Sequence, residues 1–471
     1  MKEYDEIEDQ EIFRDSIATV DQSGKRIWIY PKQPVGKFYN WRKWISYLLL
    51  VVLFILPFIK YKGRPFVQFN IPETEFILFG VYFAPQDFHL FVVAMLIGMV
   101  FIVLFTVIFG RLFCGWVCPQ TIFMEMVFRR IEYWIEGDAN AQRRLDKSEW
   151  NTDKVVKKTA KHIIFVLIAV VIAHTFLSYI IGVDELYKLV TEPLSEHWKG
   201  FVAMVVFTAV FYGVFAFLRE QVCTTVCPYG RLQGVLLDDN SLAVAYDYER
   251  GEPRGKIRKN KQTEAPPLGD CVDCRLCVQV CPTGIDIRNG TQLECVNCTA
   301  CMDACDQVME KIDRPLGLVR IDSYNGIKNR TKSLLNTRVV AYSIVLVMLI
   351  GLESFLFMSR SSMETLFLRT PGMLFQRQDD GYISNLYNYQ LINKSEIEGE
   401  IQFKSESIEG ILIEPVGMGV NAVPFEITEG AVFIKIPEEQ LKGRKNKVKI
   451  EVYNKGELVS EANTNFFGPI K

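Results

Sequence analysis

The sequence predicts a multidomain fold, with an α-helical membrane domain of five spans, a cysteine-rich insert and a C-terminal β-sandwich. Three observations predict it. Five apolar stretches interrupt an otherwise mixed composition, all 12 cysteines lie between Cys114 and Cys305, and the chain beyond Cys305 contains none. Cysteines confined to one part of the chain indicate metal or redox chemistry rather than a secreted disulfide scaffold.

The apolar stretches predict membrane spans at residues 44–59, 88–109, 162–181, 200–218 and 339–358. Four of them reach the roughly 20 residues that a helix needs to cross a bilayer. The first is shorter and contains Pro57. A buried core helix is the alternative for any one span, and four neighbours of spanning length argue against it.

Lysine and arginine predict the orientation of these spans. They are frequent before the first span, in 110–161 and in 219–338, and sparse in 60–87 and 182–199. We therefore expect a multi-pass membrane protein, with the N-terminus and the cysteine-rich insert in the cytoplasm and the residues after about 359 outside. The net charge of −2 gives no reason to expect a nucleic-acid partner.

The C-terminal segment alternates apolar and polar residues in short runs such as IEGEIQF, AVFIKI and NKVKIEVY. Glycine, asparagine and proline separate these runs. Period-two runs with turn signals at this spacing predict an antiparallel β-sandwich. Without cysteine or histidine, this domain is expected to dock partners rather than to carry a reaction.

Two tandem motifs, CVDCRLCVQVCP and CVNCTACMDACD, form the cysteine-rich insert. A C-x2-C-x2-C-x3-C run is the bacterial two-cluster ferredoxin pattern, in which the fourth cysteine of each run binds the other cluster. This predicts two [4Fe–4S] clusters, which we call cluster 1 (Cys271, Cys274, Cys277 and Cys305) and cluster 2 (Cys295, Cys298, Cys301 and Cys281). Paired C-x2-C motifs also build zinc sites, but zinc gives no reason for the strict repeat. The second run has Asp306 where the first has Pro282, which removes no ligand.

Two C-x3-C-P motifs follow the second and fourth spans, with Cys114 and Cys118 in one and Cys223 and Cys227 in the other. With Arg111 and Arg219 before them, they suggest an internal repeat. On a continuing helix, each pair would share one face about 5–6 Å apart. Four such thiols are candidate copper or redox ligands, and Cu(I), a redox dithiol and a further cluster all suit them. Four buried reduced cysteines are the plainer alternative.

The FAPQDFHLF segment contains two further polar candidates, Asp87 and His89. A metal-ligand role for this pair is one interpretation, and a histidine hydrogen-bonded to a neighbouring helix is the simpler one.

Nearly the whole chain resembles the FixG/RdxA/CcoG family, which is associated with assembly of cbb3-type cytochrome c oxidase. The resemblance rests on RIWIYPKQPVGKFYNWRK, FAPQDFHLF, both C-x3-C-P motifs, the tandem ferredoxin run and the β-rich tail. It implies a protein of the bacterial inner membrane with a cytoplasmic ferredoxin domain and a C-terminal immunoglobulin-like domain, which the predicted orientation puts in the periplasm. It also implies reduction of Cu(II) to Cu(I) for oxidase maturation.

Together, the patterns and the resemblance predict five segments: 1–43, a cytoplasmic N-terminal segment; 44–240, spans one to four; 241–338, the ferredoxin-like domain; 339–358, the fifth span; and 359–471, the sandwich. The expected function is electron transfer, with copper as substrate. The expected partners are oxidase assembly factors or a copper transporter, and an electron donor that the sequence does not identify. A quinol-linked electron conduit and a non-catalytic assembly scaffold are the alternatives.

Overall fold

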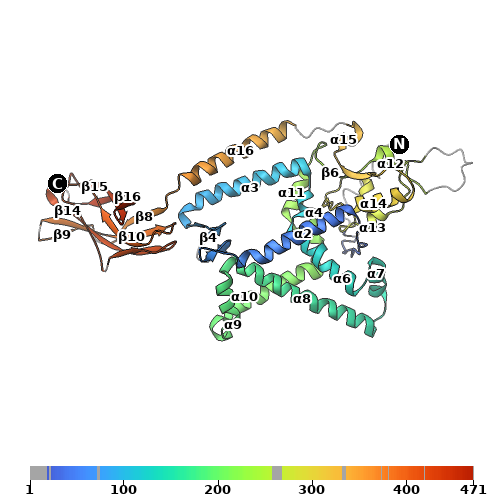
Figure 1. Cartoon of the computed structure of the whole chain (residues 1–471), viewed down its shortest axis with the longest axis horizontal. Helices are drawn as coiled ribbons and strands as arrows, with labels where there is room; N and C mark the ends of the chain where they lie inside the picture. Colours follow the sequence, from blue (N-terminus) through green and yellow to red (C-terminus); the bar gives the residue numbers. More distant parts are fainter. Residues whose placement is uncertain are drawn as a thin grey trace, which may run out of the picture. The chain divides into compact units, whose positions relative to one another are not determined.

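The computed structural model describes residues 19–20, 23–71, 75–256, 268–330, 336–372, 374–379, 381–417 and 419–469. The chain divides into two compact units (Figure 1). Unit 1 comprises Met1–Gln68 and Met95–Ile350, and unit 2 comprises Phe69–Ala94 and Gly351–Lys471.

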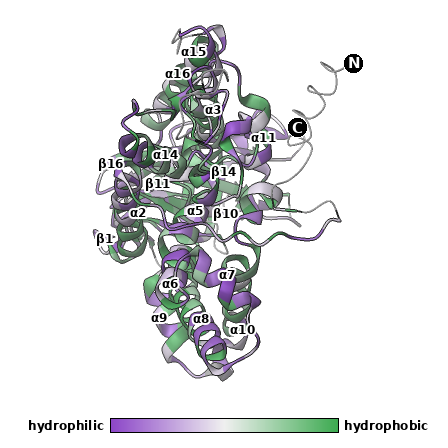
Figure 2. Ribbon diagram, turned by 90° about the vertical axis from the view of Figure 1, so that its right-hand side faces the viewer, coloured by the Kyte–Doolittle hydropathy of each residue, from purple (hydrophilic) through white to green (hydrophobic). Residues whose placement is uncertain are grey.

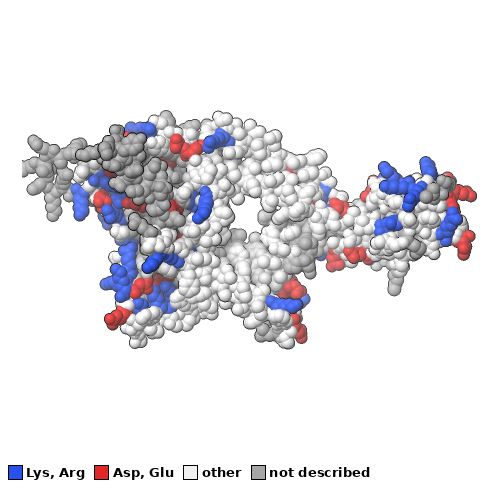
Figure 3. Space-filling view, turned by 180° about the vertical axis from the view of Figure 1, so that it is seen from behind, with Lys and Arg blue, Asp and Glu red and all other residues white. Residues whose placement is uncertain are grey.

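Within the described residues, five helices are long and apolar enough to cross a membrane: Lys37–Phe58, Pro85–Phe109, Thr152–Ile181, Ser195–Leu218 and Thr337–Met358. Their main helical parts are α2 (Lys37–Ile55), α3 (Phe88–Phe109), α8 (Thr152–Ile181), α10 (Leu194–Gly213) and α16 (Thr337–Met358). Figure 2 shows α3 and α10 as mostly hydrophobic, whereas the short helix α7 (Ala139–Lys147) is mostly hydrophilic. In Figure 3, few charged side chains lie over the membrane-length helices. The five predicted spans are thus present as helices.

Helices α2, α8 and α10 begin earlier than hydropathy predicts, and polar caps account for the first two. Helix α2 begins at Lys37, where the Asp303 carboxylate accepts hydrogen bonds from the backbone N–H groups of Phe38 (3.0 Å) and Tyr39 (2.7 Å). Helix α8 begins at Thr152 because the Asn151 side chain caps it. Hydropathy marks only the apolar part of a helix, and capping by polar groups extends both helices beyond it.

Short helices connect the second span to the third: α4 (Leu112–Trp116), α5 (Pro119–Ile122), the π-helical η3 (Phe123–Phe128), α6 (Arg129–Ile135) and α7. Aromatic rings of η3 pack between spans three and four, with Phe128 stacked on Phe215 at 4.7 Å and edge-on to Phe165 at 4.8 Å. This aromatic core fixes the connecting segment against the membrane helices.

A layer of buried ion pairs lies beyond this aromatic core. Glu132 accepts from Arg219 at 2.8 Å, and Glu220 accepts from Arg129 at 3.2 Å. Glu125 and Arg129 form an i,i+4 pair in the same layer, and both side chains are buried. Buried charges are tolerated only when they are paired. Therefore this layer constrains how α6 sits against the turn that follows span four.

The cysteine-rich insert is built on a two-stranded antiparallel sheet, β6 (Ala243–Tyr246) with β7 (Val319–Asp322). Helices α13 (Leu276–Gln279) and α14 (Ala300–Lys311) each begin after the second cysteine of one motif and contain its third. Figure 1 shows α13 and α14 beside the amino end of α2. This insert belongs to unit 1 and packs on the membrane helices.

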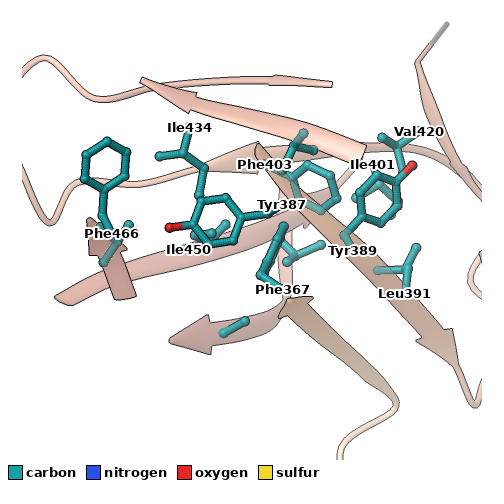
Figure 4. Packing of buried hydrophobic residues seen from close by; sticks show 14 of the residues in the cluster. Phe367, Tyr387, Tyr389, Leu391, Ile401, Phe403, Val420, Ile434, Ile450 and Phe466 are labelled. Atoms are coloured by element: carbon teal, nitrogen blue, oxygen red, sulfur yellow. The ribbon is translucent and has the colours of Figure 1, made fainter. Parts of the chain in front are cut away.

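Unit 2 contains an antiparallel β-sandwich. One sheet has the order β12-β14-β10-β8, with β9 also paired to β10, and the other has the order β13-β11-β15-β16. The strands are β8 (Met363–Arg369), β9 (Gln376–Arg377), β10 (Tyr382–Asn393), β11 (Gly399–Lys404), β12 (Leu412–Pro415), β13 (Val420–Ala422), β14 (Ile427–Pro437), β15 (Lys445–Asn454) and β16 (Glu457–Phe467). Alternate residues of these strands point into one core, where Phe403 contacts Phe367 and Tyr389 edge-on (Figure 4). The predicted sandwich is confirmed.

A hairpin of β4 (Glu75–Leu78) and β5 (Val81–Phe83) packs on the sandwich within unit 2. Asp87, just after this hairpin, pairs with Lys394 at 2.6 Å and Arg360 at 2.7 Å. Its carboxylate is therefore engaged by two cations, which leaves the metal-ligand interpretation of Asp87 with His89 without support.

Candidate metal centre

The eight cysteines of the tandem motifs line two neighbouring cavities in the insert. Cavity 1 has an empty volume of about 350 Å³, and its cysteines are Cys271, Cys274, Cys277 and Cys305. Cavity 2 has an empty volume of about 340 Å³, and its cysteines are Cys281, Cys295, Cys298 and Cys301, together with Cys277, which lines both cavities. The fourth cysteine of each motif therefore lines the cavity of the other motif.

The two motifs share one unusual backbone conformation. In the first, Asp273 and Arg275 have φ of 50° and 56°, and in the second, Asn297 and Thr299 have φ of 52° and 63°. Left-handed conformations are uncommon for residues other than glycine and gather at functional sites. Their repetition at matching positions gives both cysteine turns the same curvature around a cavity.

Asp306 has a structural explanation. It lies inside helix α14, which continues past Cys305 to Lys311, and its side chain accepts a hydrogen bond from the backbone N–H of Gly317 at 2.9 Å. Pro282, by contrast, follows α13 after that helix has ended. A proline would interrupt α14, so the second motif lacks it while Cys305 still lines cavity 1.

The donor set of each cavity fits a [4Fe–4S] cluster. Each offers four thiols around one pocket, and cysteine thiolates in groups of four hold such clusters. Burial raises the pKa of Cys277, Cys295 and Cys305 to about 12. Burial thus disfavours the thiolate form of these cysteines, and a bound metal supplies the positive charge that compensates for it.

The two cavities have different electrostatic surroundings. Arg288 lines cavity 1 but is neutralised by Asp273 and Asp286, each at 2.6 Å. Cys274, a cavity 1 residue, is exposed. A second arginine that lines cavity 1, Arg275, is exposed and lies 3.8 Å from Asp273. Cavity 1 thus faces solvent, and two carboxylates balance its two arginines.

Three buried arginines from the membrane domain surround cavity 2. Arg129 donates to the carbonyl of Pro282 at 3.0 Å, and Glu125 and Glu220 neutralise it. Arg111 donates to the side chain of Gln233 at 2.8 Å and to the carbonyl of Leu293. Arg42 donates to the carbonyl of Gly115 at 2.7 Å.

The C-x3-C-P motifs do not lie on continuing helices, so that expectation is wrong. Cys118 and Cys227 each have an extended ψ, of 123° and 113°, and each begins a new helix whose first residue is proline. A proline disfavours helical geometry at the preceding residue and is well suited to the first position of a helix. The motif sequence itself therefore breaks the helix between its two cysteines.

The motifs nevertheless form a structural repeat. The N–H of each second cysteine donates to the carbonyl five residues earlier, Phe113 for Cys118 and Val222 for Cys227. Four residues before each first cysteine, the backbone is left-handed, at Gly110 and Arg219. When the two motifs are aligned in this way, Arg219 corresponds to Gly110. Arg111 and Arg219 therefore do not occupy equivalent positions.

Three of the four motif thiols are near one another. Burial raises the pKa of Cys223 to about 12, and the next largest contributions come from Cys118 and Cys114. The Cys114 thiol donates to Gln233 at 3.3 Å. Among the described contacts, none joins the Cys227 side chain to the other three.

Gly115 brings the first of these motifs against cavity 2. A Cβ atom at Gly115 would lie 2.4 Å from the carbonyl oxygen of Val296, so only glycine permits this approach. Cys114 packs in the same apolar cluster as Val296 and Cys298. The thiol group is therefore adjacent to the wall of cavity 2.

Sequence reasoning did not place Arg42, Arg129 or Gln233 near cavity 2, and it named Arg111 only as part of the C-x3-C-P repeat. No motif marks the first three, because each comes from a different segment. Arg42 also carries no signal of its own, since arginines near the ends of membrane helices usually extend to the interface.

Comparisons with known proteins agree with these features. Residues 218–324 match a 4Fe-4S dicluster domain, residues 91–138 a 4Fe-4S binding domain, and residues 354–469 the IG-like fold at the C-terminal of FixG, described as a putative oxidoreductase. The match at 91–138 includes Cys114 and Cys118, which lie outside the tandem motifs.

Three curated relatives are similar over much of their length. The nitrogen fixation protein FixG of Rhizobium meliloti is 31% identical over 88% of this chain and 87% of its own. Protein RdxA of Cereibacter sphaeroides is 36% identical over 62% of this chain and 61% of its own. Protein RdxB of the same organism is 32% identical over 79% and 80%. With its membrane-length helices, iron–sulfur domains and C-terminal Ig-like sandwich, the chain belongs to the FixG/RdxA family.

Proposed function

We propose that this protein transfers electrons through two [4Fe–4S] clusters to Cu(II), producing Cu(I) for the maturation of a cbb3-type cytochrome c oxidase. Cluster 1 would be held by Cys271, Cys274, Cys277 and Cys305, and cluster 2 by Cys281, Cys295, Cys298 and Cys301. Each cluster, when bound, supplies one-electron transfer.

The observation that carries the proposal is the position of Cys114. It packs beside Cys298 of cavity 2, and Cys118 and Cys223 are close enough to Cys114 to interact with it electrostatically. Soft thiolates favour Cu(I) over harder ions. An electron leaving cavity 2 would thus meet a group of thiols suited to the product of copper reduction.

The proposed path begins at the exposed Cys274 and ends at these thiols. A low-potential one-electron donor would supply each electron, and one Cu(II) would be reduced for each electron received. The membrane topology that we propose has the N-terminus and the insert in the cytoplasm and the sandwich in the periplasm. We also propose the division of the chain into the five segments that the sequence predicts.

The test is reduction of Cu(II) by the full-length protein in detergent, after its clusters have been reduced with dithionite and the excess reductant removed. We expect cluster reoxidation with formation of one Cu(I) per cluster electron. A C114S/C223S protein should keep its iron content and lose this rate, whereas a C277S protein should lose iron. Copper reduction that is unchanged in the C114S/C223S protein would contradict the role of these thiols, and cluster reduction by quinol without any response to copper would favour an electron conduit.

A further inference from the structure

Arg42 is a buried cation whose partner carries no charge. Its side chain is 1% exposed, and Nε donates to the carbonyl of Gly115 at 2.7 Å. The described part of the chain places no carboxylate within ion-pair distance of it and no hydrogen-bond partner on Nη2. Burying a guanidinium in this way is unfavourable unless another group compensates for it.

The position of Arg42 identifies that group. Its acceptor, Gly115, lies directly against the carbonyls of Val296 and Asn297, between the ligand candidates Cys295 and Cys298. Burial raises the pKa of Cys298 to about 11, and the positive charge of Arg42 is the strongest of the effects that lower this pKa. Glu125 acts against Arg42 there, but Glu125 is paired with Arg129. The positive charge of Arg42 is therefore directed toward cavity 2.

We propose that Arg42 compensates for the charge of the cluster in cavity 2 and raises the reduction potential of that cluster. This inference rests on the ligand set in the proposed function. A cluster held by four thiolates is anionic and gains a further negative charge on reduction, which burial disfavours. Net charge around a cluster is one of the factors that set such potentials, and Arg42 holds its charge on Gly115, which lies against Val296 in the wall of cavity 2.

The role suits arginine in particular. The guanidinium does not lose its proton in proteins, so its charge is constant over the whole physiological pH range. Its fork holds one donor on Gly115 while it leaves another free, which the single ammonium of lysine does not reproduce. The single charge of Arg42 would thus act on Gly115 of α4, on the neighbouring thiols and on cavity 2.

A redox titration followed by EPR tests the inference without copper. The full chain in detergent would be compared with R42Q and R42K, and with K43Q as the matched control, because Lys43 is the next residue of α2 and loses the same charge. C274S in each background would identify the signal of cluster 1. We expect R42Q to lower the equilibrium constant for reduction of cluster 2 by about tenfold, or about 59 mV for one electron.

The control and cluster 1 should be unchanged, and R42K should show a smaller shift in the same direction. Two clusters with wild-type potentials in R42Q would overturn the inference. If R42Q does not retain its clusters, R42K decides, and an unchanged cluster 2 potential in R42K overturns it. A wild-type protein that binds fewer than two clusters overturns the ligand assignment itself, which distinguishes failure of the proposed function from failure of the Arg42 inference.

Discussion

Gly115 and Val296 approach so closely that a Cβ atom at Gly115 would lie 2.4 Å from the Val296 carbonyl oxygen. This contact joins the first C-x3-C-P motif to the second cysteine turn of the insert. Both partners are backbone, so neither has a flexible end that moves aside. The separation between the motif thiols and cavity 2 is consequently fixed by a glycine.

The G115A substitution should therefore push α4 away from the second cysteine turn of the insert. We expect a loss of about 1–3 kcal/mol in stability from overpacking and slower reoxidation of the clusters by Cu(II). Thermal unfolding in detergent and stopped-flow absorbance would measure the two effects. G98A is the matched control, because a Cβ at Gly98 in helix α3 meets nothing within 4 Å. Equal stability and equal reoxidation rates in G115A and G98A would contradict a role for the contact between Gly115 and Val296.

The buried ion pairs should contribute far more to stability than the exposed ones. Glu220 is buried and accepts from Arg26 and Arg129, so E220Q leaves buried positive charge uncompensated. We expect destabilisation of roughly 3–5 kcal/mol. D153N removes the partner of Lys157 in a pair whose side chains are 62% and 37% exposed. It should cost at most about 1 kcal/mol, and chemical unfolding of both variants would show whether burial makes this difference.

In unit 2, Asp87 should hold the β4–β5 hairpin to the sandwich. D87N removes the charge that Lys394 and Arg360 share, and both Asp87 and Lys394 are almost fully buried. We expect faster hydrogen exchange of the β4 and β5 amides, with the sandwich strands unaffected. R377Q breaks an exposed pair with Glu438 and serves as the control. Unchanged exchange in D87N would show that the apolar contacts alone hold the hairpin.

Removal of iron by anaerobic chelation should loosen the insert and leave the sandwich intact. Without metal, the buried thiols are protonated at neutral pH, because burial raises the pKa of Cys277, Cys295 and Cys305 to about 12. Hydrogen exchange should increase in α13 and α14. It should also increase at Phe38 and Tyr39, because their backbone N–H groups donate hydrogen bonds to the carboxylate of Asp303 in α14.

Reloading of the iron-free protein should also depend on pH. Each ligand releases a proton when it binds metal, so affinity rises with pH from neutrality toward those pKa values. Proton release and iron content, measured at two pH values, would check the sign. Iron uptake that is independent of pH would contradict protonated thiols in the metal-free state.

Much of this architecture follows from local sequence patterns. The apolar stretches predicted the five membrane-length helices, the alternation after residue 376 predicted the sandwich, and the tandem motif predicted which cysteines share a cavity. Each of these features depends on the periodicity or spacing of neighbouring residues, which a sequence displays directly.

The C-x3-C-P motifs show the limit of that reasoning. Proline at positions 119 and 228 starts a new helix, so the preceding helical turn ends before Cys118 and Cys227. This local effect can be read from the sequence, but the i,i+4 spacing suggested a continuing helix instead. The apparent match of Arg111 with Arg219 was also wrong, since Gly110 and Arg219 occupy the equivalent left-handed position.

The sequence by itself determined the chemistry of this protein: which residues are soft ligands, how they are grouped and which segments are apolar enough for a membrane. Only the tertiary structure decided what surrounds those ligands. Arg42, Arg129 and the short segment that holds Arg111 and Gly115 converge on cavity 2 from different parts of the chain. Their partners are mostly backbone carbonyls, which every residue possesses, so no sequence pattern records the pairing, and the folded chain alone sets the charge around the metal centre.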